Sequence, residues 1–106
     1  MNIWIINGPN LNLLGIRDQS IYGSVTWDET LTQLRNDFQS SEIKIEYFQS
    51  NHEGHIIDKL QEIGFDDSTY GIINPGGLTH TSISIRDCVD AITVPFVEVH
   101  ISDIKS

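Results

Sequence analysis

The sequence contains one cysteine, few basic residues and no long apolar run, and each shortage excludes a class of protein. A single thiol, Cys88, cannot form an internal disulfide, and we expect it to be a small buried residue of a helix. Six lysines and arginines against fifteen acids give a net charge of −9, which repels nucleic acid and anionic membranes. An anionic substrate would therefore need a local pocket of cations or amide groups.

The apolar runs are short throughout. The first of them, Ile3 to Ile6, cannot form the core of a signal peptide or a membrane helix, and there is no N-x-S/T sequon. We therefore expect a cytoplasmic location. With 106 residues, 39% of them hydrophobic, the chain has the size and composition of one globular domain spanning residues 1–106.

Apolar spacing predicts that strands and helices alternate along the chain. Buried or alternating apolar runs predict strands at residues 2–7, 42–48, 70–74 and 94–99. Helical spacing predicts helices from Thr26 to Phe38, from Glu53 to Ile63, and after Pro75-Gly76-Gly77 to about Ile92. Thr26 and Glu29 have the spacing of a capping box, and Gly64 is expected to end the second helix. This order predicts an α/β fold with a mostly parallel sheet and helices on both faces.

Polar residues gather where the predicted strands end. Ligands of open parallel sheets bind beyond the carboxyl ends of the strands, at the point where the strand order reverses. Three strands end in polar runs: Asn7-Gly8-Pro9-Asn10, Asn74-Pro75-Gly76-Gly77 and Glu98-Val99-His100-Ile101-Ser102. The strand at 42–48, whose alternation predicts a sheet edge, ends plainly in Gln49-Ser50-Asn51. With the common strand order 2-1-3-4, the three polar ends are neighbours, which predicts a small-molecule site.

The connection from Gly8 to Val25 is longer than most strand-to-helix loops, and such loops often close over active sites. It contains Arg17 and Tyr22. A tyrosine is a poor base at neutral pH, but a neighbouring guanidinium favours its phenolate form. The loop is therefore either a solvated connection or a lid that carries an arginine–tyrosine general base.

Five segments resemble the signature segments of type II 3-dehydroquinate dehydratases, in the order and spacing of that family. Several matched segments are more specific than any single short motif. They are Ile6 to Gly15 (INGPNLNLLG), Tyr22 to Ser24 (YGS), Phe48 to Gly54 (FQSNHEG), Leu78 to Ser82 (LTHTS) and Val97 to Ser102 (VEVHIS).

The resemblance implies a flavodoxin-like three-layer sandwich with strand order 2-1-3-4. It implies a hydro-lyase that removes water from 3-dehydroquinate by anti elimination through an enolate, giving 3-dehydroshikimate. This reaction serves the shikimate pathway or quinate catabolism, and it uses no metal and no cofactor. It also implies a homo-oligomer, since the family forms dodecamers built as tetramers of trimers.

Catalytic roles follow from the resemblance, position by position. Tyr22 would be the base that takes the C2 proton, and Arg17 would keep it ionised. Asn10 would hold the water that supports the enolate oxygen. His100 would protonate the departing C1 hydroxyl, and Glu98, two residues earlier on the same strand, would orient it.

Substrate-binding roles follow in the same way. Asn74, the Ile101 amide and Ser102 match the subsite for the substrate carboxylate. His80 matches a contact to the ring hydroxyls. Arg86 and Asp87 match positions near a neighbouring subunit in family assemblies.

The same residues have simpler interpretations when they are taken singly. His100 could be a structural histidine, and Asn10 and Asn74 could be turn formers beside proline. His52 and His55 suggest a metal site, but the run H-E-G-H differs from H-E-x-x-H and no third ligand is evident, so exposure and helix capping explain them better.

Two departures from the family keep another function open. Asp103 stands where the family has asparagine, which puts a carboxylate beside a carboxylate subsite. The sequence also stops at Ser106, where family members continue with an arginine-containing segment, a fifth strand and a helix. A catalytically weak or inactive remnant that keeps the binding cleft is therefore the alternative. A phosphoacceptor receiver fits less well, because Asn74 and Asn10 stand where it needs acidic residues, and a flavin binder fits less well, because Gly8-Pro9-Asn10-Leu11-Asn12 offers few hydroxyls for a phosphate.

Overall fold

The computed structural model describes residues 1–100, except for the side chains of Ile21 and Tyr22. The four strands are β1 (Asn2–Asn7), β2 (Lys44–Gln49), β3 (Thr69–Asn74) and β4 (Phe96–Glu98). The helices are η1 (Leu11–Leu13), α1 (Gln19–Tyr22), α2 (Trp27–Asp37), α3 (Glu53–Ile63), η2 (Gly76–Thr79) and α4 (Ile83–Ala91). No helix in residues 1–100 has the length and apolar character needed to cross a membrane.

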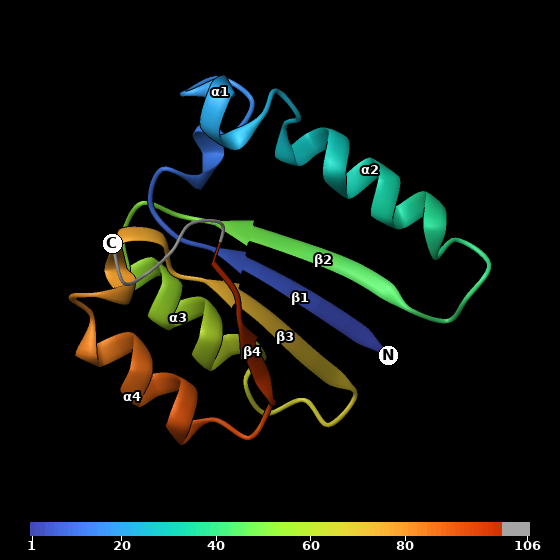
Figure 1. Ribbon diagram of the computed structural model, residues 1–106. Coiled ribbons are helices and arrows are strands. Elements are labelled where there is room, and N and C mark those ends of the chain that lie inside the picture. The colour runs from blue at the N-terminus through green and yellow to red at the C-terminus, as the bar shows by residue number, and fades with distance from the viewer. Residues whose placement is uncertain (101–106) are drawn as a thin grey trace.

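The strands form one parallel sheet in the order β2-β1-β3-β4, as predicted. Helix α2 covers one face, and α3 and α4 cover the other (Figure 1). The predicted edge position of β2 is confirmed. The strand order reverses between β1 and β3, which is where such folds bind ligands.

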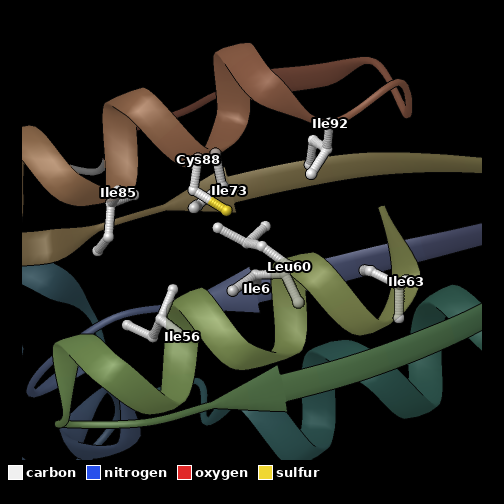
Figure 2. Packing of buried hydrophobic residues seen from close by; sticks show 8 residues of the cluster. All are labelled: Ile6, Ile56, Leu60, Ile63, Ile73, Ile85, Cys88 and Ile92. Carbon is white, nitrogen blue, oxygen red and sulfur yellow. The ribbon is translucent and has the colours of Figure 1, made fainter. Parts of the chain in front are cut away.

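Two layers of apolar side chains hold the helices to the sheet. Between the sheet and the pair α3 and α4 lies a cluster that includes Ile6, Leu60 and Ile73, and Ile6 and Leu60 are fully buried. Figure 2 shows side chains of α3 and α4 pointing toward one another and toward these strand residues. The opposite layer is smaller and centres on Leu31 of α2. The prediction for Cys88 is confirmed, because it is buried in the larger cluster.

Local chemistry explains where the helices begin. The predicted capping box of α2 is present: Thr26 Oγ1 accepts from the Glu29 amide at 3.2 Å, and Glu29 Oε2 accepts from the Thr26 amide at 3.3 Å. The segment after Gly77 is divided, because η2 ends at Thr79 and α4 begins only after Ser82. Ser82 Oγ accepts from the Ile85 amide at 3.0 Å, so this hydroxyl fixes the start of α4.

Two predicted strands are shorter than the sequence pattern suggested. The strand predicted at 94–99 is β4, Phe96–Glu98, because the amides of Thr93 and Val94 donate to Gly64 O at the end of α3 and not to the sheet. Pro95 has no amide hydrogen to add to the ladder. The strand predicted from residue 42 begins at Lys44, because Ser41 Oγ accepts from the Ile43 amide in the preceding turn.

Candidate active site

The ends of β1, β3 and β4 meet at one edge of the sheet, as the sequence predicted. Asn7 is in register with Asn74, and Ile73 is in register with Glu98. The Val99 amide donates to Ile73 O at 2.8 Å, so the chain stays beside β3 as it leaves β4. The residues that follow these three strands therefore start from adjacent positions (Figure 1).

Asn10 occupies a tight turn after β1. The Leu11 amide donates to Gly8 O at 3.4 Å, and Asn10 has φ 70° and ψ −4°. Proline in second position and a positive φ in third position are typical of a type II turn. Asparagine tolerates this left-handed conformation better than most residues do. The turn-forming interpretation of Asn10 therefore holds, and the conformation also sets the direction of its side chain.

Asn74 makes the corresponding turn after β3. It is buried, and its Oδ1 accepts from the Gly76 amide at 3.1 Å. Its backbone oxygen accepts from the Gly8 amide at 2.8 Å. A Cβ atom on Gly8 would lie 2.3 Å from Pro75 O, so only glycine allows the two turns to approach this closely. Asn74 is therefore a turn former too, and its turn is locked to that of Asn10.

Glu98 and His100 are paired at the end of β4. Glu98 Oε2 lies 3.6 Å from His100 Nε2, with 20% of the histidine side chain and 56% of the glutamate side chain exposed. Both side chains lie on the same side of the chain, as their spacing predicts. The carboxylate thus lies where it can orient the imidazole, and the ring remains accessible to a ligand.

The loop from Gly8 to Val25 contains two short helices, η1 and α1, that the sequence analysis did not predict. Arg17 stands before α1, and its Nη2 lies 3.5 Å from Asp18 Oδ2. Tyr22 is the last residue of α1. Because the Tyr22 side chain is outside the described part of the structure, the pairing of Arg17 with Tyr22 stays a prediction. Ile101 and Ser102 also lie outside the described residues.

A hollow of about 250 Å³ opens between α4, η2 and the ends of β3 and β4. Glu98 and Arg86 line it, together with apolar side chains such as Phe96. His80 is exposed at the end of η2. Asp87 lines a different groove, on the outer side of α3 and α4, so the structure does not bring it to the hollow that contains Glu98.

The charges around this edge are unevenly distributed. Lys44 is the first residue of β2, and Arg35 donates to Ile45 O beside it. Both cations therefore lie at the end of the sheet opposite to the polar strand ends. Lys59 lies on α3, 5.1 Å from the Trp4 ring centre. Of the arginines and lysines in residues 1–100, Arg17 and Arg86 remain on the side of the strand ends. An anionic ligand would therefore depend on few cations and on amide dipoles.

Sequence reasoning missed the contribution of β2. Its end is not plain, because Gln49 and Asn51 both make hydrogen bonds to the turn that carries Asn10. Asn7, 1% exposed, donates from Nδ2 to Tyr47 Oη at 3.2 Å, and burial raises the pKa of Tyr47. The predicted strand order 2-1-3-4 could have revealed the contribution of β2, because it places the end of β2 directly beside the end of β1.

The two histidines near the start of α3 lie together at the surface. Their ring centres are 4.7 Å apart, and both residues are exposed. His52 occupies the N-cap position but makes no capping hydrogen bond with its side chain, so exposure explains the pair and capping does not. Within residues 1–100, no three histidine, cysteine, aspartate or glutamate side chains are grouped as metal ligands would be.

A parallel sheet whose polar strand ends flank the reversal of strand order is typical of α/β proteins that bind small molecules. The family model described as dehydroquinase class II matches residues 1–106. The 3-dehydroquinate dehydratase of Caldicellulosiruptor bescii is 49% identical over 104 residues, which are 98% of this chain and 72% of that protein. That of Sulfurimonas denitrificans is 51% identical over 105 residues, 99% of this chain and 65% of that protein.

A solved structure agrees with these sequence relatives. The type II dehydroquinase from Butyrivibrio crossotus matches with a TM-score of 0.88 and 45% identity, covering 99% of this chain and 73% of that chain. The chain therefore belongs to the class II dehydroquinase family and has its flavodoxin-like fold. It spans about two thirds to three quarters of the length of these relatives.

Proposed function

We propose that this protein dehydrates 3-dehydroquinate to 3-dehydroshikimate by anti elimination through an enolate, in the shikimate pathway or in quinate catabolism. Membership of the family supports the reaction, because its curated relatives are named 3-dehydroquinate dehydratase. The observation that carries the proposal is the pair formed by Glu98 and His100 at the strand edge that also carries Asn10 and Asn74. This pair supplies a proton donor, His100, next to the fixed polar groups of the two turns.

In the first step, Tyr22 removes the C2 proton of the substrate. The phenolate form of a tyrosine needs a nearby positive charge at neutral pH, and Arg17 supplies it. Arg17 precedes α1 and Tyr22 ends it, so one short segment carries both residues. This proximity along the chain supports the assignment of a base and its activating cation.

In the second step, water leaves from the enolate. Asn10 holds a water molecule against the enolate oxygen, where fixed dipoles stabilise charge that forms only during the reaction. His100, oriented by Glu98, protonates the departing C1 hydroxyl. The 3.6 Å contact between the Glu98 carboxylate and the imidazole supports this division of roles.

Substrate binding uses the turns around the same edge. Asn74, the Ile101 amide and Ser102 hold the carboxylate, and His80 contacts the ring hydroxyls. Asp87 contributes from a neighbouring subunit, which fits its position in the groove on the outer side of α3 and α4. The shortage of cations on this side supports recognition of the carboxylate by amide and hydroxyl groups.

We also propose that the chain is a single domain that acts in the cytoplasm as a homo-oligomer, a dodecamer built as a tetramer of trimers. Large apolar side chains on its surface support self-association: Phe65 is 61% exposed, Ile83 78% and Val97 63%. Sedimentation velocity at several concentrations tests this, and a monomer at every concentration would contradict it.

The decisive experiment compares Tyr22→Phe with the unchanged protein in an assay of the ultraviolet absorption of the conjugated enone product. We expect the variant to lose turnover and keep its circular dichroism spectrum. Tyr70→Phe is the matched control, because Tyr70 is 48% exposed on β3 and has no proposed role. Tyr22→Phe with most of the parental rate would overturn the assignment. An unchanged protein that binds substrate without turnover would support the inactive remnant instead.

Two further variants separate the steps. His100→Ala is expected to slow hydroxyl departure and to leave exchange of the C2 proton with solvent deuterium detectable. Complete loss of exchange would place His100 in proton abstraction. Arg17→Ala is expected to leave a residual rate that rises with pH, and a flat pH response would contradict the pairing with Tyr22.

A further inference from the structure

The turn that carries Asn10 is held by side chains from the edge strand β2. Asn51 Oδ1 accepts from the Asn10 amide at 3.0 Å. Gln49 Nε2 donates to Gly8 O at 3.2 Å and to Asn51 Oδ1 at 3.2 Å, and it lies 3.5 Å from Asn12 Oδ1. Gln49 thus links Gly8, the first residue of the turn, to Asn51, which binds the amide of Asn10 at the third position.

The hydrogen bonds act on a conformation that needs support. Asn10 has a left-handed backbone with φ 70°, which costs an ordinary residue about 1 to 2 kcal/mol. Its amide is bound by Asn51, and its backbone oxygen accepts from the Leu13 amide at 3.0 Å. Because the Cβ direction follows from the backbone angles, fixing φ of Asn10 also fixes the direction of the Cα–Cβ bond from which its carboxamide extends.

Contacts to β3 do not replace these bonds. The Gly8 amide donates to Asn74 O, and a Cβ atom on Gly76 would lie 2.9 Å from Pro9 O, so the first half of the turn is packed against β3. Of the contacts that Asn10 makes within residues 1–100, the bond to Asn51 is the one that reaches another strand end. The third position of the turn therefore depends on the segment after β2.

We propose that Gln49 and Asn51 are positioning residues that act on the reaction through Asn10. This rests on the proposed role of Asn10 in the dehydration. Stabilisation of the enolate needs the Asn10 carboxamide in one place, whereas substrate binding depends mainly on other groups. Loss of the Asn51 bond should therefore lower kcat and leave KM nearly unchanged. Displacements of about 1 Å in such sites cost on the order of a hundredfold.

The test is a double-mutant cycle in kcat. Asn51→Ala is expected to lower kcat by roughly tenfold to a hundredfold, with KM changed by less than about threefold. In the Asn10→Ala background, the same change should have almost no further effect, because Asn51 acts through Asn10. Asn36→Ala, an exposed asparagine at the end of α2, is the matched control and should keep the parental kcat.

A second measurement does not depend on activity. Hydrogen exchange of the Asn10 amide, followed by nuclear magnetic resonance, should accelerate at least tenfold in Asn51→Ala and stay unchanged in Asn36→Ala. Gln49→Ala should accelerate it less, because Gln49 supports Asn51 and does not contact this amide.

The outcomes separate two failures. If Asn10→Ala has the parental kcat, the proposed role of Asn10 fails and the positioning role fails with it. If Asn10→Ala is slow but Asn51→Ala is not, or if the two losses multiply in the double variant, the positioning role alone is overturned. An unchanged exchange rate of the Asn10 amide in Asn51→Ala would also overturn it.

Discussion

Adding one methyl group at Gly71 should destabilise the protein, because a ring already occupies the space. Gly71 lies on β3 in register with Phe96 on β4. An added Cβ would lie 2.1, 2.3 and 2.4 Å from three atoms of the Phe96 ring, whereas ordinary contacts are 3.4 to 4 Å. The ring covers the glycine across the strand pair, so it must move by about 1 Å or more to admit alanine.

The size of the effect follows from two opposing contributions. Extra atoms in a packed site cost about 1 to 3 kcal/mol. Replacing glycine with alanine also restricts the unfolded chain, which offsets about 0.4 to 1 kcal/mol. The hollow that Phe96 lines gives the ring some room to retreat, which favours the lower part of the first range. We therefore expect Gly71→Ala to lower the free energy of unfolding by about 0.5 to 1.5 kcal/mol.

Urea denaturation of Gly71→Ala, Phe96→Leu and the double variant measures this directly. Leucine removes ring atoms that clash, so the double variant should be more stable than the two single losses predict, by about 1 kcal/mol. Gly54→Ala is the control of opposite sign, because Gly54 lies in α3 with open space around its Cβ direction, and it should stabilise slightly. Strictly additive losses at Gly71 and Phe96 would refute the reasoning.

Three further changes test other parts of the structure. Thr26→Ala removes the oxygen that caps α2 and should cost about 1 kcal/mol in chemical denaturation, most of which Thr26→Ser should restore. Burial, with Asp87 adding to it, raises the pKa of the Cys88 thiol, so iodoacetamide at pH 8 should modify the native protein far more slowly than the unfolded one, and equal rates would contradict this. Hydrogen bonds from Ser68 lower the pKa of Asp66, so this carboxylate adds stability above the pKa of an unfolded aspartate, about 4, and the contribution is lost as pH falls through the lower folded pKa. Ser68→Ala removes the 2.9 Å hydroxyl bond and should raise the Asp66 pKa in an NMR titration, whereas an unchanged value would show that this hydroxyl contributes nothing to the lowered pKa.

The sequence predicted those elements whose boundaries depend on local chemistry. Strand β1 and helix α3 have the predicted limits, because the first ends in Asn7-Gly8-Pro9 and the second ends before Gly64. Gly64 ends α3 through close packing and not through a left-handed backbone: an added Cβ would lie 2.5 Å from Leu60 O and 2.6 Å from Ile92 Cγ2. The glycine at position 64 was therefore enough to predict where α3 ends. The reason that a glycine is needed there, its close approach to Leu60 and Ile92, required the structure.

Boundaries that depend on distant partners were less predictable. The start of β4 is set by Gly64, which takes the amides of Thr93 and Val94 away from the sheet. No spacing within residues 94–99 reveals that competition, because Gly64 lies in another element. Helix α1 is too short for apolar periodicity to reveal it, and the same is true of η1 and η2.

The site divides in a similar way. The grouping of Asn10, Asn74, Glu98 and His100 at one edge follows from strand order alone, so the sequence could predict it. The hydrogen bonds that fix these residues could not be predicted, since amide side chains such as Gln49 and Asn51 can bond to solvent, to their own backbone or to a neighbouring turn with similar energies. The pairing of β2 with β1 brings Gln49 and Asn51 to the turn after β1 and so determines which of these partners they bind. A residue's chemistry therefore indicates that it belongs at such an edge, whereas the register of the neighbouring strand determines whether it binds the ligand or holds the residue that does.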